Sequence, residues 1–200
     1  GALYLAVNAL YIVSVVVGMA GPDEIRRPAV ALQATASAAT IAMAWSFYEL
    51  LKPAARGLAL LALLFRVAES ALYGVAAIFS LLVLSGDPPS TPGPDQAALA
   101  LAARARFASG YVGTVYFCAG SAIFFYLLFK GRFIPRTISG LGLLATAVVL
   151  AATLVRMAAP QLAGYVAFSD PLLLLAETAT GAWLVVRGAR SQSQIPSSSG

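Results

Sequence analysis

The sequence predicts an all-α fold, a polytopic bundle of six transmembrane helices, and three observations support this prediction. The chain has 200 residues, of which 60% are hydrophobic and 10% are charged, and its mean hydropathy is +0.85. Soluble domains carry roughly 25% charged residues, so this chain has too little polar surface to cover itself in water. Apolar runs of about 20 residues, the length of a membrane span, recur six times along it. We therefore expect a single membrane domain over residues 1–190, followed by a disordered Ser-rich tail over residues 191–200.

The first three spans are expected at residues 2–20, 28–51 and 57–85. The first contains Asn8 and two tyrosines, which the apolar core of a signal peptide usually avoids, so a spanning helix is favoured over a cleaved signal. It is expected to end at Gly21-Pro22, and the natural start of the chain is expected to lie upstream of residue 1. The second span, "ALQATASAATIAMAW", is rich in Ala, Ser and Thr, which is typical of a buried helix with close neighbours.

The last three spans follow a loop, "GDPPSTPGPD", whose proline and glycine content excludes a helix. They are expected at residues 107–129, 137–157 and 169–187. The first of these helices is expected to begin outside the bilayer near Pro94, a residue suited to a first helical turn. The turn "KGRFIPR" separates it from the next helix. The last helix is expected to start with Ser169-Asp170 as its N-cap and Pro171 in its first turn.

Six crossings would leave both chain ends on one side of the membrane. The basic residues expected on that side are Lys52, Arg56, Lys130, Arg132, Arg136, Arg187 and Arg190. Those expected on the opposite side are Arg26, Arg27, Arg104, Arg106 and Arg156, together with the acidic Asp23, Glu24, Asp87 and Asp95. The positive-inside rule therefore favours cytoplasmic termini. Abundant alanine and the excess of Arg over Lys favour a bacterial source, and so a multi-pass protein of a bacterial cytoplasmic (inner) membrane.

Three charged residues lie deep inside the expected spans, where an isolated charge costs about 2.5–3.5 kcal/mol on insertion scales. Arg66 and Glu69 belong to the third span, in "FRVAES", and Glu177 belongs to the sixth. A rise of about 1.5 Å per residue places them roughly 14, 18 and 15 Å from the cytoplasmic ends of their helices, near the bilayer midplane. Residues three apart face the same side of a helix. We therefore predict a buried salt bridge in which Arg66 joins both carboxylates and ties the third helix to the sixth.

Other polar side chains recur at helical spacing and should face the bundle interior with these charges. The stripes comprise Tyr4, Asn8 and Tyr11; Ser70 and Tyr73; Tyr111, Thr114, Cys118 and Ser121; Thr146 and Thr153; and Thr180. The candidate site is a polar layer of Arg66, Glu69, Glu177, Tyr73, Asn8 and Ser121. This layer either binds a ligand or ion, or only fixes helix packing. Outside it, Glu49 and Lys52 are predicted to form an interfacial pair, and Lys130-Gly131-Arg132 to set the topology.

Few residues of the chain suit catalysis or metal binding. It has no histidine, which removes the commonest metal ligand and the usual proton shuttle at neutral pH. It also lacks a phosphate-binding loop, metal-ligand spacings and nucleophile motifs. Its one cysteine, Cys118, lies in an apolar helix and is predicted to be an inert core residue. We therefore predict no catalytic residue, no metal and no cofactor, and we attribute the net charge of +5 to cytoplasmic loops and not to nucleic-acid binding.

Three blocks of the chain occur in an order and spacing that resemble a known family: "LLKPAARGLALLALLFRVAESALYGV", "GYVGTVYFCAGSAIFFYLLFKGRFIPRTISGLGLL" and "LLLLAETATGAWLVVRG". The family is the bacterial domain-of-unknown-function family numbered four-three-eight-six, a set of six-helix membrane proteins. The resemblance is carried by Arg66 and Glu69, by the turn Phe133 to Arg136, and by Glu177 with Trp183. It covers nearly the whole chain and implies the fold and the membrane location, but no substrate. Members often carry a histidine near residues 117–120, and its absence here argues against a proton relay.

These features together predict a non-enzymatic membrane protein with a buried Arg-Glu layer, which binds a small molecule or lipid or serves as an accessory subunit. The expected partners are membrane lipids and either a small amphipathic ligand or another membrane protein. The alternative is an ion-coupled transporter that uses Glu69 or Glu177. Carriers usually contain internal repeats or interrupted helices, and the sequence shows no clear repeat, so the binding protein is favoured. An intramembrane enzyme ranks below both.

Overall fold

The computed structural model describes residues 1–20, 23–84 and 96–188, and every regular element in these ranges is helical. The elements are α1 (Ala2–Ala20), α2 (Asp23–Leu84), α3 (Gln96–Lys130), α4 (Arg136–Ala158), the 3₁₀ helix η1 (Pro160–Val166) and α5 (Ser169–Val186). The all-α prediction is therefore confirmed for the described chain. The predicted break at Gly21-Pro22, the loop at residues 86–95 and the tail at residues 191–200 lie outside the described residues.

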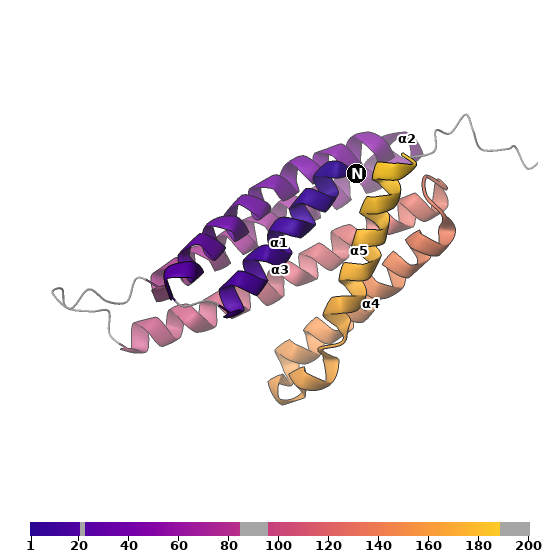
Figure 1. Cartoon of the computed structure of the whole chain (residues 1–200). Coiled ribbons are helices and arrows are strands. Elements are labelled where there is room, and N and C mark those ends of the chain that lie inside the picture. Colours follow the sequence, from indigo (N-terminus) through magenta and orange to yellow (C-terminus); the bar gives the residue numbers. More distant parts are fainter. Residues whose placement is uncertain (21–22, 85–95, 189–200) are drawn as a thin grey trace, which may run out of the picture.

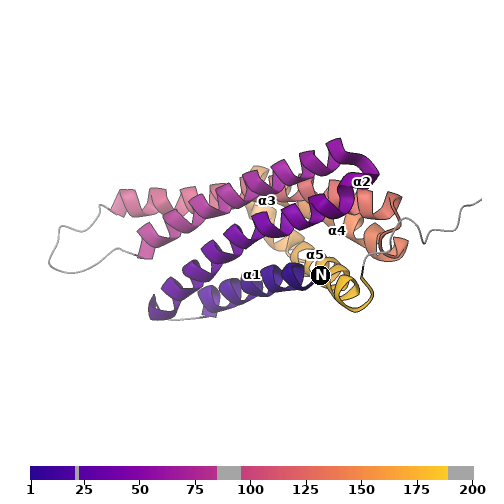
Figure 2. The same cartoon turned by 90° about the horizontal axis from the view of Figure 1, so that it is seen from above.

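Helix α2 folds back on itself and contains two of the predicted helices. At Ala55, two residues after Pro53, the backbone leaves the helical conformation (φ −165°, ψ 89°). Figure 2 shows the two arms, residues 23–54 and 56–84, as a hairpin joined at this break. The predicted start of the first arm at Pro28 is wrong, because the helix begins at Asp23. Pro28 is exposed and is the sixth residue of this helix, which continues through it.

The helices pack in a ring of neighbours. Helix α1 packs against α2 and α5, α2 packs against α3, and α4 packs against α3 and α5. In Figure 1, α5 is inclined to α1 and comes close to it at the chain start, where Gly1 lies against Leu184. The beginning of α1 and the end of α5 therefore share one end of the bundle. The largest fully buried apolar side chains are Met43, Leu51, Leu127, Leu128 and Ile134, from α2, α3 and the turn before α4.

Two serines join the arms of α2 through a reciprocal pair of hydrogen bonds. The Ser37 hydroxyl donates to the Ser70 carbonyl at 2.6 Å, and the Ser70 hydroxyl donates to the Ser37 carbonyl at 2.6 Å. Both side chains are buried. Small hydroxyl residues let two helix backbones approach closely and bond across the interface. This contact accounts for Ser37 in the first arm, whose Ser- and Ala-rich sequence predicted close neighbours.

The double substitution Ser37→Ala and Ser70→Ala is expected to lower the free energy of unfolding by about 1–3 kcal/mol, since each lost hydrogen bond contributes roughly 0.5–1.5 kcal/mol. Denaturant titration of the protein in mixed micelles measures this difference. Ser46→Ala is the matched control, because the exposed Ser46 hydroxyl donates only to the Ala42 carbonyl of its own helix. A double variant as stable as the control would show that the cross-arm bonds contribute nothing.

The turn "GRFIP" between α3 and α4 fills the end of the bundle with apolar side chains. Phe133 and Ile134 are 4% and 1% exposed and pack into the main core. Gly131 makes this possible, because a Cβ at that position would overlap the Phe133 ring. The Pro135 carbonyl accepts the backbone N–H groups of Ile138 and Ser139 and so starts α4. The predicted turn is confirmed, and its buried pair explains the apolar residues within it.

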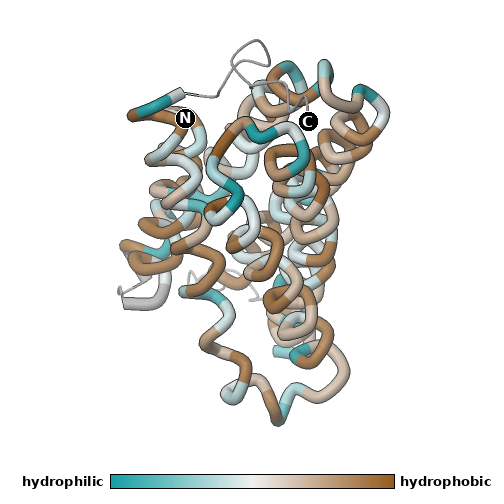
Figure 3. The backbone as a smooth tube through the Cα atoms, turned by 90° about the vertical axis from the view of Figure 1, so that its right-hand side faces the viewer, coloured by the Kyte–Doolittle hydropathy of each residue, from teal (hydrophilic) through white to brown (hydrophobic). Residues whose placement is uncertain are grey.

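The bundle has an apolar surface and many polar side chains inside. Hydrophobic residues dominate the helices along their length (Figure 3). Exposed large apolar residues include Leu61, Leu64, Ile78 and Leu82 on α2, Leu144 and Leu154 on α4, and Leu175 and Val185 on α5. Three described helices are long and apolar enough to cross a membrane, at Ile25–Leu84, Gln96–Lys130 and Arg136–Ala158, while Ala2–Gly18 is shorter. These features suggest a membrane-embedded protein, and the predicted count of six spans stays a prediction.

Candidate functional site

The side chain of Arg66 lies inside the bundle and is only 4% exposed. Its Nη1 atom is 3.0 Å from Oε2 of Glu69 and donates a hydrogen bond of 3.3 Å to the Ser121 hydroxyl on α3. The guanidinium group also faces the ring of Phe117, 4.7 Å from the ring centroid. A Cβ on Gly120 would lie 3.1 Å from Cδ of Arg66, so the missing side chain leaves room for the arginine between α2 and α3. One face of α3 therefore holds this side chain in place.

The predicted three-residue salt bridge is only half formed. Arg66 and Glu69 form a buried ion pair, but among the described residues no ion pair joins Arg66 to Glu177. Helix α5, which carries Glu177, packs against α1 and α4 and not closely against α2. The prediction that Arg66 ties the third helix to the sixth is therefore wrong. Glu177 is 8% exposed; it lines the same cavity as Arg66, whose charge attracts it, and Tyr4 of α1 lies beside it.

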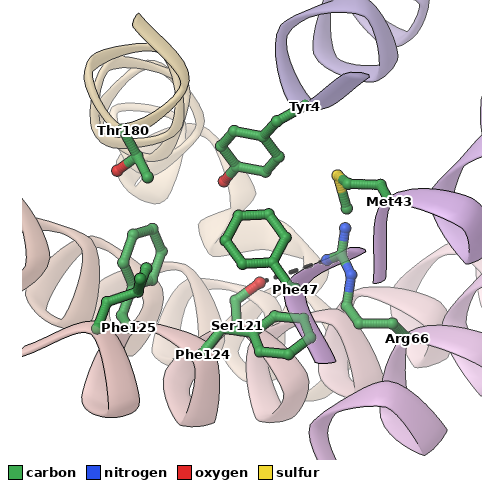
Figure 4. A pocket seen from close by; sticks show the side chains of 9 residues that line it. Tyr4, Met43, Phe47, Arg66, Ser121, Phe124, Phe125 and Thr180 are labelled. Atoms are coloured by element: carbon green, nitrogen blue, oxygen red, sulfur yellow. Dashed lines mark hydrogen bonds between the residues drawn. The ribbon is translucent and has the colours of Figure 1, made fainter. Parts of the chain in front are cut away.

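A small hollow of about 10 Å³ lies between Arg66 and Thr180. Figure 4 shows Arg66 on one side of it, Thr180 on the other, and the rings of Tyr4 and Phe47 between them. Its wall also includes Ser121, which the dashed line in Figure 4 joins to Arg66. This volume is about that of a single water molecule. The hollow is too small for an organic ligand.

A larger, partly open cavity of about 250 Å³ lies on another side of the Arg66 side chain, and all five described α-helices line it. Its wall contains five of the six residues predicted as the polar layer, namely Asn8, Arg66, Glu69, Tyr73 and Glu177. Ser121 is the exception, because it lies in the wall of the small hollow. The predicted layer is therefore gathered around a cavity and not around a closed salt bridge.

Aromatic and hydroxyl side chains form the middle of this cavity. The rings of Tyr11 and Tyr73 meet edge to face with their centroids 5.8 Å apart. The hydroxyls of Tyr73 and Thr114 share a hydrogen bond of 3.1 Å, which fixes the Tyr73 ring against α3. Gly113 leaves room for that ring, since a Cβ there would lie 3.2 Å from it. The Tyr11 and Tyr73 rings therefore form a corner of the wall.

An ion pair lies at the exposed end of the cavity. Arg156 at the end of α4 donates two hydrogen bonds, of 3.0 and 2.9 Å, to the two carboxylate oxygens of Asp170 in the first turn of α5. The Asp170 side chain is 61% exposed, whereas that of Arg156 is 16% exposed. Arg156 also donates to the Val166 carbonyl and the Ser169 hydroxyl. The pair thus fastens η1 and the start of α5 to α4.

The predicted N-cap of α5 is wrong. The Ser169 hydroxyl donates to the Val166 carbonyl at 2.8 Å, and no side chain caps the helix start. Phe168 is already helical (φ −62°, ψ −17°), so the chain enters α5 from η1 without the extended residue that an N-cap requires. Asp170 lies inside the first turn of α5, and its carboxylate accepts hydrogen bonds from Arg156 and not from the helix start.

Four buried polar atoms in the wall of the large cavity have no hydrogen-bond partner in the described chain. They are Nδ2 of Asn8, the hydroxyl of Tyr11, Nε of Arg66 and Oε2 of Glu69. The last of these lies 3.0 Å from Arg66 but is not hydrogen-bonded to it. Most buried polar groups in proteins are hydrogen-bonded, so such a cluster in one cavity needs an explanation. The wall offers both donors and an acceptor to a molecule inside it.

Sequence reasoning missed the contribution of Arg156 and Asp170 to the cavity. Arg156 was assigned to a loop-facing helix end and Asp170 to a cap, and only the path of η1 brings the two together. The sequence did contain a signal for this ion pair, because Arg156 and Asp170 carry opposite charges at the adjoining ends of consecutive helices. Within the described ranges, no three His, Cys, Asp or Glu side chains gather as a metal site.

Two predictions outside the cavity are confirmed. Glu49 and Lys52 form an ion pair of 2.6 Å in which both side chains are 43% exposed, and its location at the membrane interface stays a prediction. Cys118 is 1% exposed and packs beside Phe117 and Val149, as expected for a core residue.

The model of the family described as "Domain of unknown function (DUF4386)" matches residues 1–188. The chain belongs to the DUF4386 family. The resemblance seen in the sequence is thereby confirmed, and it brings no activity with it. A search of curated proteins and a search of solved structures each gave no match. What this DUF4386 protein does must therefore be inferred from its cavity, which has a mixed apolar and polar wall and lies just below the roughly 300–1,000 Å³ of typical ligand sites.

Proposed function

We propose that this DUF4386 protein is a non-enzymatic membrane protein that binds a small molecule in the 250 Å³ cavity. The observation that carries the proposal is the set of four buried polar atoms in one wall that make no hydrogen bond in the described chain, although Oε2 of Glu69 is ion-paired with Arg66. Each such atom costs roughly 1–3 kcal/mol when it stays unsatisfied. A ligand that pairs with these atoms would recover part of that cost, which gives the cavity a reason to hold a polar molecule.

The size and position of the cavity support a small ligand over a whole lipid. Its volume is below that of most sites for drug-sized molecules. Its exposed end is marked by the Arg156–Asp170 pair, and its inner end by the nearly inaccessible Arg66–Glu69 pair. A ligand would therefore enter between α4 and α5 and reach the centre of the bundle.

We also propose that residues 1–190 form one domain that crosses a bacterial cytoplasmic membrane six times, with both ends in the cytoplasm. Each arm of α2, residues 23–54 and 56–84, exceeds the roughly 20 residues that a span needs. The closeness of Gly1 to the end of α5 supports an even number of crossings. Cysteine scanning with a membrane-impermeant label at residues 52 and 132 tests this orientation, since both should be labelled only from the cytoplasmic side.

Filling the cavity is expected to expel the ligand. In Leu173→Trp a larger side chain replaces one that lines the cavity. In the control Leu175→Trp the same change is made on the same helix at a residue that is 60% exposed and absent from the cavity wall. Protein purified from native membranes is denatured, and the released small molecules are identified by mass spectrometry. We expect one molecule at near-equimolar amount in the wild type and the control, and at least tenfold less in Leu173→Trp.

Equal recovery from all three proteins, or no co-purified molecule from the wild type, would contradict the proposal.

Ion-coupled transport through Glu69 and Glu177 is not favoured. Carriers usually place interrupted helices at the ion site, whereas the break at Ala55 is remote from both carboxylates in the chain. If the wild type carries a solute into proteoliposomes and Glu177→Gln does not, the protein is a transporter and the binding proposal is wrong.

A further inference from the structure

The large cavity contains more carboxyl groups than cations. Its wall holds the guanidinium groups of Arg66 and Arg156 and the carboxyl groups of Glu69, Asp170 and Glu177. Arg66 pairs with Glu69, and Arg156 pairs with Asp170. No described cation forms an ion pair with Glu177, and its side chain is buried, with 8% exposed. Arg66 pairs with Glu69 and also attracts Glu177, so two buried carboxylates depend on one guanidinium, and a further positive charge in the cavity would be stabilised there.

A second acceptor faces the same space. Oε2 of Glu69 is buried and has no hydrogen-bond partner, although the carboxylate is close to Arg66. Glu69 is 2% exposed, so water outside the protein does not satisfy this oxygen. The wall therefore combines one carboxylate that forms no ion pair of its own with another whose Oε2 accepts no hydrogen bond.

Aromatic rings stand next to these carboxylates. Tyr11 and Tyr73 form the corner described above, and both line the cavity with Glu69 and Glu177. The faces of aromatic rings attract cations, and aromatic walls combined with a carboxylate are suited to alkylated ammonium groups. The ring of Phe117 already faces the Arg66 guanidinium, so the two tyrosines are the rings available to a ligand.

We propose that the cavity binds a small organic ammonium ion, which Glu177 neutralises and which the Tyr11 and Tyr73 rings surround with aromatic surface. This inference rests on the proposed function and specifies its ligand class. The unpartnered Nδ2 donor of Asn8 favours an ammonium ion that also carries an oxygen acceptor. An inorganic cation would gain less from the apolar and aromatic part of the wall, and an anion would be repelled by Glu177. The ammonium group belongs either to a free solute or to a lipid head group.

Binding of choline to the purified full chain in maltoside micelles, measured by calorimetry, tests the proposal. Choline has a quaternary ammonium group and a hydroxyl, and its neutral carbon isostere, 3,3-dimethylbutan-1-ol, has the same shape without the charge. We expect choline to bind at least tenfold more tightly than the isostere. Glu177→Gln is expected to weaken choline binding at least tenfold, while Glu49→Gln, a change in the exposed pair, leaves it unchanged. If Glu177→Gln does not fold, Tyr11→Leu is expected to weaken choline binding in the same way.

Competition separates the two sources of the ammonium group. Displacement of choline by lysophosphatidylcholine at a similar concentration assigns the site to a head group, and no displacement assigns it to a free solute. Equal binding of choline and its isostere, or an unchanged affinity in both the Glu177→Gln and Tyr11→Leu variants, would overturn the ammonium ligand. Displacement of choline by sodium at equal concentration would also overturn it. A molecule that still co-purifies with the wild type and is lost in Leu173→Trp would then leave the proposed binding function standing.

Discussion

Replacing Arg66 with methionine is expected to lower the free energy of unfolding by about 3–5 kcal/mol, the usual cost of removing one partner from a buried ion pair. Methionine keeps much of the length of the side chain but loses its charge. Glu69, which is 2% exposed, would then be a buried carboxylate without a counter-ion, and Ser121 would lose its hydrogen-bond donor. Denaturant titration in mixed micelles, followed by circular dichroism, measures the change.

The matched control is Lys52→Met, which removes the cation from the Glu49–Lys52 pair. Both of these side chains are 43% exposed, and exposed pairs contribute about 0–1 kcal/mol, so the control should be almost as stable as the wild type. Adding Glu69→Gln to Arg66→Met is expected to recover much of the lost stability, because the stranded charge is removed. If Arg66→Met costs no more than Lys52→Met, the guanidinium group is solvated and the ion pair does not stabilise the fold.

Most helices could be predicted from the sequence because the apolar runs are long and their ends are marked by charges, proline or glycine. The expected helix at residues 2–20 coincides with α1, and the one at 137–157 lies within α4, which is Arg136–Ala158. The error at Pro28 arose because proline is common in the first turn of a helix, whereas here it is the sixth residue of α2. The apolar pattern did not predict how the two helices of α2 are connected. The sequence predicted two separate helices, and the structure joins them through a break at one residue, Ala55.

The candidate site was predicted less completely, because helical spacing fixes which face of a helix a residue occupies but not which helix lies opposite. Arg66 and Glu69 are on one helix three residues apart, and their pairing was correctly predicted. The estimated depth of Glu177 placed it in the same layer as Arg66 and Glu69. Depth alone does not determine which helices are neighbours within that layer. The lateral arrangement depends on close contacts such as that of Gly120 with Arg66, and on α1 standing beside α5. The layer is therefore a cavity wall, which Glu177 and Arg66 both line without forming an ion pair.

Replacing Gly142 with valine is expected to destabilise the protein by about 2–3 kcal/mol, because inserted methyl groups cannot be accommodated in a closely packed helix interface. A Cβ on Gly142 of α4 would overlap the ring of Phe125 on α3. Phe125 is 3% exposed and packed into the main core, so its ring cannot move aside. Removing a glycine from a helix gains at most about 1 kcal/mol of helix propensity, which does not offset this overlap.

Gly140 provides the matched control for this substitution. It lies two residues earlier on the same helix, and a Cβ there would meet no atom within 4 Å. Gly140→Val is therefore expected to change stability by less than about 0.5 kcal/mol, as is usual for changes away from packed contacts. In the Gly142→Val background, Phe125→Leu should restore part of the loss, because the smaller side chain leaves room for the valine. Thermal melting of the wild type, Gly142→Val, Phe125→Leu and the double variant in micelles measures this coupling. Equal melting temperatures for Gly142→Val and Gly140→Val would contradict the close contact between α3 and α4. The side of the cavity that Thr114 and Val149 form depends on this contact.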